Sequence, residues 1–257
     1  MPDTTLAALV DDLASPDPAV RDEHAYAALT RLVRAGAVGP GDLPWLVSTM
    51  LERLGDERTE VRTFAPLVLA ALVEAGDANG VDPAEVARDW VPAVARWYVG
   101  EADLRGHDPQ LGWLHAVAHG ADFFGACGSA GVGEAEPLLD ALAQRLVAPT
   151  PFVWRDQEDD RLACALALVL ARPGLGADAA TGWLGPVRAL FATGAPGAVP
   201  AEASNTMRTL RSLHVALGEQ VLRSGEPVPV EHAALVRTEV AAVLAEVTPW
   251  FWAPLPR

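Results

Sequence analysis

The segment Asp17–Leu29 reads DPAVRDEHAYAAL, and the segment Asp56–Leu67 reads DERTEVRTFAPL. In both, an acidic turn is followed by Val-Arg and then by an apolar, alanine-containing helix, and the two lie about one HEAT period apart, near 40 residues. A third segment, Glu158–Leu166 (EDDRLACAL), has a similar order. A helix pair with one apolar side must stack on its neighbours to bury that side. These segments therefore predict a HEAT-like stack of helix pairs.

The rest of the chain also has helical periodicity. Apolar residues recur at spacings of three and four, and no convincing period-2 run of β-branched and aromatic residues is present. We therefore expect an all-α chain with essentially no sheet, folded as a HEAT-like or armadillo-type α-α superhelix of about ten or eleven helices. We expect it to form a single helical-repeat domain over residues 1–257. The apolar positions that show the spacing most clearly are Val20, Tyr26, Leu29 and Val33, and later Val86, Trp90, Val94 and Trp97.

Start and stop signals for helices divide the sequence at intervals. Asp-Pro pairs place an N-cap residue before a proline at the first helical position. Glycines that follow an apolar periodic segment indicate helix ends. The Asp-Pro pairs are Asp17-Pro18, Asp82-Pro83 and Asp108-Pro109, and the glycines are Gly36, Gly76 and Gly174.

The charge of the chain argues against several functions. The 257 residues carry a formal net charge of −15, and no arginine-rich run would form a basic groove. Such a chain repels phosphate backbones, so we expect no nucleic-acid partner. Lysine is absent, which excludes a phosphate-binding loop of the Gly-x-x-x-x-Gly-Lys type. The acidity itself is interpreted as a contribution to solubility.

The cysteines and the apolar runs indicate the compartment. Cys127 and Cys164 form no Cys-x-x-Cys pair and stand among apolar or small residues, so we expect buried, reduced thiols. The N-terminal segment Met1–Ser15 contains acidic residues and no basic one, unlike a secretory signal. The longest apolar runs, Phe64–Val73 and Leu162–Ala171, are about half the length that a membrane span needs. We expect a cytoplasmic protein without a membrane partner.

The stretch Glu101–Phe124 is the one that suggests chemistry, because a polar, glycine-containing loop leads into a helix there. His115 and His119 are four residues apart and share a helix face, and Asp122 follows three residues later. Two imidazoles and a carboxylate at this spacing can hold one divalent metal ion. The pattern lacks the glutamate of zinc proteases, since Ala116 follows the first histidine.

Two other interpretations of this stretch remain open. The histidines could form a buried polar network with Asp103, Asp122 or the backbone and hold the loop against the helix. Alternatively, a small-ligand pocket could use Arg105 as an anion clamp and Trp113 as a stacking wall. Glu101 and His107 offer further oxygen and nitrogen atoms. The polar network is favoured over the metal site, because polar clusters in helical proteins are commonly structural.

Asp22 and Glu23 lie early on the first repeat helix. If the repeat helices line one concave face, these carboxylates could meet His115 and His119 and form a pocket for general acid–base or metal chemistry. The competing interpretation is that they are ordinary first-turn acids that interact favourably with the helix dipole.

The sequence resembles the bacterial family of uncharacterised proteins called DUF2785 in four runs: Asp103–Gly106, Gly112-Trp113, His115-Ala116 and Ala118–Asp122. Segments early and late in the chain resemble the family as well, although His214 stands where a tyrosine is expected. The resemblance implies an all-helical, HEAT-like fold and almost nothing about activity. The motif positions that it marks are Asp22, Glu23, Asp103, Arg105, Trp113, His115, His119 and Asp122.

Taken together, the sequence favours a helical scaffold that binds an unknown protein or a small-molecule ligand through the face carrying Glu101–Asp122. We expect no cofactor; the alternative is a metal-dependent, hydrolytic enzyme that holds a divalent metal with His115, His119 and Asp122. The aromatic tail Trp250–Trp252 is expected to close the last groove of the stack. The residues expected to bind the ligand are Asp22, Asp103, Arg105, Trp113, His115, His119 and Asp122.

Overall fold

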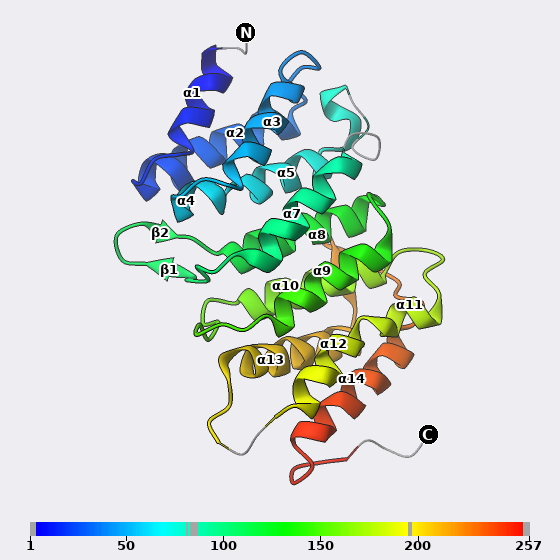
Figure 1. Ribbon diagram of the computed structural model, residues 1–257. Helices are drawn as coiled ribbons and strands as arrows, with labels where there is room; N and C mark the ends of the chain where they lie inside the picture. Colours follow the sequence, from blue (N-terminus) through cyan, green and yellow to red (C-terminus); the bar gives the residue numbers. More distant parts are fainter. Residues whose placement is uncertain (1–3, 81, 83–86, 195–196, 254–257) are drawn as a thin grey trace.

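In the computed structural model, the described residues are 4–80, 82, 87–194 and 197–253, and within them eleven α-helices have eight residues or more. The helices stack in two layers along the long axis of the molecule (Figure 1). The first layer contains α2 (Ala27–Arg34), α5 (Ala65–Glu74), α8 (Ala116–Ala130), α10 (Glu158–Leu170) and α13 (Ala201–Ala216). The second layer contains α3 (Leu43–Arg53), α7 (Trp90–Gly100), α9 (Ala135–Val147) and α12 (Leu184–Ala192). The expected all-α superhelix is confirmed.

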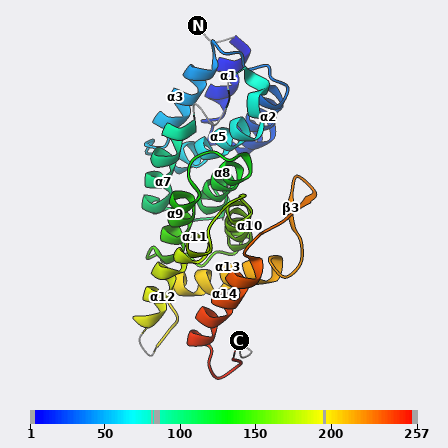
Figure 2. The ribbon, with the colours of Figure 1, turned by 90° about the vertical axis from the view of Figure 1, so that its right-hand side faces the viewer.

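The side view separates the two layers (Figure 2). Successive helices of each layer pack side by side, and the core between the layers is continuous from the first helices to the last. Helix α1 (Thr4–Asp12) packs on the π-helical turn η1 (Ala19–Tyr26), and α14 (Ala233–Val247) packs on α11 (Ala177–Gly182), α12 and α13. The shorter helices α4 (Thr59–Arg62), η2 (Gly76–Asn79) and η3 (Ala87–Asp89) lie in connections.

Helix α8 of the first layer is largely buried, and small residues allow its close packing on α10. A Cβ added to Gly128 would lie 2.9 Å from the backbone nitrogen and Cα of Val169, and one added to Gly125 would lie 3.4 Å from Cα of Ala165. Phe123 and Phe124, on the same helix, have no exposed surface. A helix that is apolar nearly all round is typical of a core position.

The predicted helix boundaries are confirmed at several points. The backbone nitrogen of Ala19 donates to Oδ1 of Asp17 at 2.9 Å, as an N-cap should. Gly36 and Gly76 follow α2 and α5 with φ of +66° and +60°, the left-handed conformation that ends helices. Pro83 and Val86, which the sequence placed at another helix start and in a periodic run, lie outside the described residues.

Two short antiparallel hairpins depart from the expected absence of sheet. Strands β1 (His107–Asp108) and β2 (Gly112–Trp113) lie in the loop before α8, and β3 (Val221–Arg223) and β4 (Glu226–Val228) precede α14. Asp108-Pro109 was therefore wrongly assigned to a helix start. Oδ1 of Asp108 accepts hydrogen bonds from the backbone nitrogens of Gln110 and Leu111, because an Asp-Pro pair suits a turn as well as an N-cap.

Two predictions about burial were wrong. Cys164 is exposed, while Cys127 is buried as expected, because Cys164 lies on the side of α10 that faces a groove instead of another helix. Trp250 and Phe251 are 82% and 72% exposed, so these two residues do not close the stack. The backbone turns outward after α14, and only Trp252 of the aromatic tail packs partly against the core.

None of the described helices combines the length and the apolarity that crossing a bilayer requires.

Candidate functional site

The loop between α7 and α8 carries most of the predicted motif, and Glu101 fixes its first residues. The carboxylate of Glu101 accepts hydrogen bonds from Nε and Nη2 of Arg62 at 2.5 and 2.9 Å and from Nε1 of Trp97 at 3.1 Å. It also accepts from the backbone nitrogen of Asp103 at 2.8 Å. Glu101 is 7% exposed. This side chain therefore anchors the loop to α4 through Arg62 and to α7 through Trp97.

Arg105 is held between two carboxylates of the same loop. It donates from Nε and Nη2 to Asp103 at 2.9 and 2.6 Å and from Nη1 to Asp108 at 2.5 Å. Thr59 donates a further hydrogen bond to Asp103 at 2.9 Å. Burial tends to raise the pKa of Asp103, but the hydrogen bonds from Arg105 and Thr59 outweigh it and lower that pKa. The positive charge expected to clamp an anion is already paired within the loop.

Trp113 is an exposed member of the motif, with 45% of its surface accessible. Its ring lies between two imidazoles, with centroid distances of 4.7 Å to His107 and 4.4 Å to His115. The hairpin β1–β2 produces this arrangement, because His107 and Trp113 are paired across it. The loop thus presents a cluster of inclined aromatic rings at the N-terminal end of α8.

Asp22 contacts the motif loop through Arg21. Oδ1 of Asp22 lies 2.7 Å from Nε of Arg21, whose side chain has no exposed surface. Arg21 in turn donates to the carbonyl oxygens of Leu111 at 2.6 Å and of Trp113 at 3.3 Å. Burial raises the pKa of Asp22, partly offset by Arg21. Sequence reasoning singled out Asp22 but missed Arg21, whose side chain contacts the carbonyl oxygens of the motif loop. Glu23, the other predicted carboxylate on this helix, is exposed.

His119 is buried and is bound to the backbone of a neighbouring repeat. Its Nδ1 lies 3.0 Å from the carbonyl oxygen of Thr63, and because a carbonyl can only accept, Nδ1 carries the proton. Burial, with a smaller contribution from His115, lowers the pKa of His119 to about 3. The imidazole is therefore neutral near pH 7, and it packs edge-on against the ring of Phe64 at 5.0 Å.

Asp122 faces a different surface of α8 and pairs with Arg161 of α10 through two hydrogen bonds, from Nε to Oδ1 at 2.8 Å and from Nη2 to Oδ2. Burial raises the pKa of Asp122, and the Arg161 guanidinium opposes that shift. The ion pair joins α8 to α10 where their sides are not covered by another helix.

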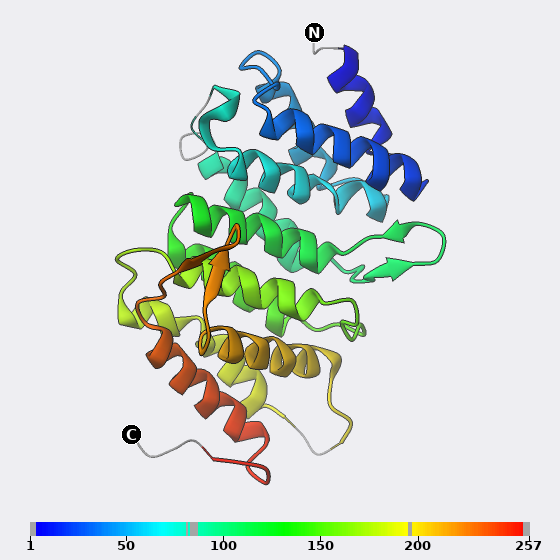
Figure 3. The same ribbon diagram turned by 180° about the vertical axis from the view of Figure 1, so that it is seen from behind.

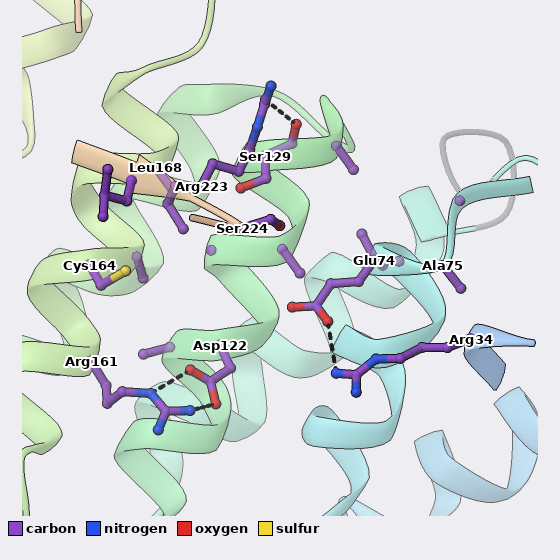
Figure 4. A pocket seen from close by; sticks show the side chains of 18 residues that line it. Arg34, Glu74, Ala75, Asp122, Ser129, Arg161, Cys164, Leu168, Arg223 and Ser224 are labelled. Carbon is purple, nitrogen blue, oxygen red and sulfur yellow. Dashed lines mark hydrogen bonds and ion pairs between the residues drawn. The ribbon is translucent and has the colours of Figure 1, made fainter. Parts of the chain in front are cut away.

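This pair lies in a groove of about 850 Å³ on the first layer (Figure 4). Helices α5, α8 and α10 form its sides, and the β3–β4 hairpin lies across α8 and α10 (Figure 3). On α8 and on α10, the lining residues recur at spacings of three and four. The lining side chains that can bind a polar ligand are Arg34, Glu74, Asp122, Ser129, Arg161, Cys164, Arg223 and Ser224.

The three residues of the predicted metal site do not converge in the structure. His119 binds the Thr63 carbonyl and Asp122 binds Arg161. Within the described residues, the group of three ligand-bearing side chains that lie within 4.8 Å of one another is His115, Asp156 and Glu158. Sequence reasoning missed the two carboxylates, although they stand directly before and at the start of the third repeat segment.

The helical layers and the groove on one of them define the chain as a helical-repeat protein with a candidate ligand-binding surface. A family model described as "Protein of unknown function (DUF2785)" matches residues 49–215, and the chain belongs to this family. Among solved structures, a designed armadillo repeat protein, YIII(Dq)4CqI, matches with a TM-score of 0.39 and 16% identity, covering 95% of this chain and 100% of the other. No curated protein matches the sequence.

Proposed function

We propose that this protein is a binding scaffold, and that the groove between α5, α8, α10 and the β3–β4 hairpin receives an anionic group of a partner protein or of a small ligand. The observation that carries the proposal is the set of guanidinium groups in the groove. Arg34, Arg161 and Arg223 line it together with two carboxylates, Glu74 and Asp122. This local excess of one positive charge contrasts with the net charge of −15 on the whole chain.

The two carboxylates leave part of this positive charge available. Arg34 and Glu74 are 3.8 Å apart and more than half exposed, so their pairing is weak. Arg223 donates to the carbonyl oxygen of Ser129 at 3.2 Å and forms no ion pair in the described part of the chain. A ligand carboxylate can therefore pair with Arg223 without displacing a charged partner, and guanidinium groups suit such recognition.

The size and surroundings of the groove also support ligand binding. Its volume of about 850 Å³ lies in the range of pockets that hold small molecules or a short peptide segment. Distant acidic residues of the chain repel an anion weakly at physiological salt, where charges are screened beyond about 8 Å. The nearby arginines consequently dominate the field inside the groove.

The proposal moves the binding site away from the loop that the sequence indicated. Asp122, at the end of the motif, lines the groove, whereas Asp103, Arg105 and Trp113 lie in the loop before α8 and do not line it. We place this binding in the cytoplasm, as expected from the sequence, and two free thiols accord with a reducing compartment.

Cys164 provides a reporter for the test, because it is exposed in the groove. Burial raises the pKa of both thiols, that of Cys127 to about 12, and only Cys164 is exposed, so a maleimide should alkylate Cys164 first. The probe is a short peptide of alternating aspartate and alanine, and its lysine counterpart is the control. We expect the aspartate peptide to slow alkylation of Cys164 and the lysine peptide to leave the rate unchanged.

Variants connect that protection to the groove. Arg223→Gln and Arg161→Gln should each reduce protection by the aspartate peptide. Arg188→Gln should not, because Arg188 pairs with Glu239 on α14 and does not line the groove. Equal protection by both peptides, or protection that survives in Arg223→Gln and Arg161→Gln, would show that the groove is not an anion-binding surface.

A further inference from the structure

The N-terminal ends of α8 and α10 meet beside the motif loop, and both begin after an unusual residue. His115, directly before α8, has φ of +45°, and Gln157, directly before α10, has φ of +67°. Residues other than glycine are uncommon in this left-handed conformation, which costs free energy unless the surroundings maintain it. These two turns place His115, Asp156 and Glu158 in one cluster, with a ligand atom of each within 4.8 Å of the others.

Two polar atoms of this cluster are buried without a hydrogen-bond partner among the described residues. They are Nε2 of His115 and Oε1 of Glu158. Glu158 is 1% exposed, and its other oxygen accepts from the backbone nitrogen of Asp156 at 2.8 Å. Leaving such an atom unpaired is unfavourable, and more so where the group is charged. Two such atoms in one cluster therefore indicate that something else binds them.

Gly106 allows the two carboxylates to pack directly against the motif loop. A Cβ at this position would overlap both Oδ2 of Asp156 and Oε1 of Glu158. The carbonyl oxygen of Gly106 also accepts hydrogen bonds from the backbone nitrogens of Leu114 at 2.9 Å and of His115 at 3.2 Å. One glycine thus lets both carboxylates approach the loop and holds the histidine turn in place.

We propose that His115, Asp156 and Glu158 bind a divalent transition-metal ion, zinc in the first instance, through Nε2 and one oxygen of each carboxylate. Zinc takes imidazole nitrogen and carboxylate oxygen as ligands, and three protein ligands leave a position for water. Magnesium and calcium prefer oxygen ligands alone, so the imidazole argues against them. The ion would pair the buried atoms of His115 and Glu158 and offset the negative charge that burial disfavours.

This site is separate from the groove and from the metal site that the sequence suggested. It shares only His115 with the predicted set of His115, His119 and Asp122. It includes none of the residues that line the groove. Binding of zinc here and binding of an anion in the groove can therefore fail independently.

The test is calorimetric titration of chelator-treated protein with zinc chloride, with thermal unfolding measured in parallel. We expect one equivalent to bind and the melting temperature to rise, because an ion that binds only the folded state stabilises it. His115→Asn and Glu158→Gln should each weaken binding at least about tenfold, since ligand loss exceeds the effect of losing a supporting residue. Asparagine tolerates a positive φ, and glutamine can still accept from the Asp156 nitrogen, so both variants should fold.

Three further variants complete the test. Gly106→Ala should weaken zinc binding, because the added Cβ would displace the carboxylates of Asp156 and Glu158. Asp156→Asn changes the less buried carboxylate and should also weaken zinc binding. His24→Asn is the matched control, because His24 is 63% exposed and lies 4.0 Å from Asp12, a pair that could hold zinc weakly at the surface. Absence of stoichiometric zinc binding, or loss of binding in His24→Asn with retention in His115→Asn and Glu158→Gln, overturns the proposal.

Discussion

Nη2 of Arg21 donates a hydrogen bond to the carbonyl oxygen of Leu111 at 2.6 Å, across 90 residues of sequence. The same guanidinium pairs with Asp22 and lies 4.8 Å from the centre of the Phe64 ring. Arg21 therefore joins the first repeat, the second repeat and the motif loop. The Asp22 motif position has a physical role in this arrangement, because its carboxylate compensates the charge of a fully buried arginine.

Replacing Arg21 by leucine should lower the free energy of unfolding by about 3–5 kcal/mol, because the Asp22 carboxylate and the loop carbonyls lose their partner. Urea denaturation followed by circular dichroism measures the change. Arg31→Leu is the control, because Arg31 is exposed and should change stability by no more than about 0.5 kcal/mol. Equal effects of the two substitutions would refute the anchoring role of Arg21.

Gly128→Ala should destabilise the protein although alanine favours helices over glycine by about 1 kcal/mol. The added Cβ would lie 2.9 Å from the backbone of Val169 and force α8 and α10 apart, at a cost of about 1–3 kcal/mol. Gly185→Ala on α12 should instead stabilise the protein slightly, since a Cβ there meets nothing within 4 Å. Melting temperatures that rise in both variants would contradict the close packing of α8 on α10.

Asp103 predicts a pH dependence of stability. Its pKa in the folded protein is below the usual value of 3.8, so the ionised carboxylate stabilises the fold above that value. The stabilisation is lost as the pH falls through the lowered folded pKa. We therefore expect the native protein to have a higher melting temperature than Asp103→Asn at pH 6. This difference in melting temperature should shrink toward pH 3. Asp178→Asn, at an exposed position, should change the melting temperature less. If the melting-temperature difference between native protein and Asp103→Asn does not depend on pH, the ionisation of Asp103 is not linked to stability.

The fold could be predicted because its signals are local. Asp17 and Gly36 mark helix ends through their own backbone conformation and capping, and the spacing of Leu29 and Val33 identifies the buried side of the helix. The β1–β2 hairpin could not be predicted, because Asp108-Pro109 has the same local chemistry in a turn as at a helix start.

The arrangement of the candidate sites depends on contacts that sequence spacing does not contain. His115 and His119 are four residues apart, but the partner of His119 is a carbonyl 56 residues away, and the carboxylates near His115 come from the turn before α10. Cys164 lies in an apolar run, and its exposure depends on which side of α10 lacks a covering helix. Arg161 and Cys164 are three residues apart on α10, and this pair of non-aliphatic residues on one helix face was the sequence pattern that could have indicated the groove.

The β3–β4 hairpin has a consequence for the length of any bound chain. Its residues Leu222, Arg223 and Ser224 line the groove, and β3 packs against α10 (Figure 3). The exposed surface of the first layer is therefore interrupted at α10 instead of running uninterrupted to α13. A long extended polypeptide would meet the hairpin as a barrier, whereas a short segment or a chain end fits before it. If the groove has the binding function proposed above, the hairpin would restrict its ligands by length, in addition to the restriction by charge.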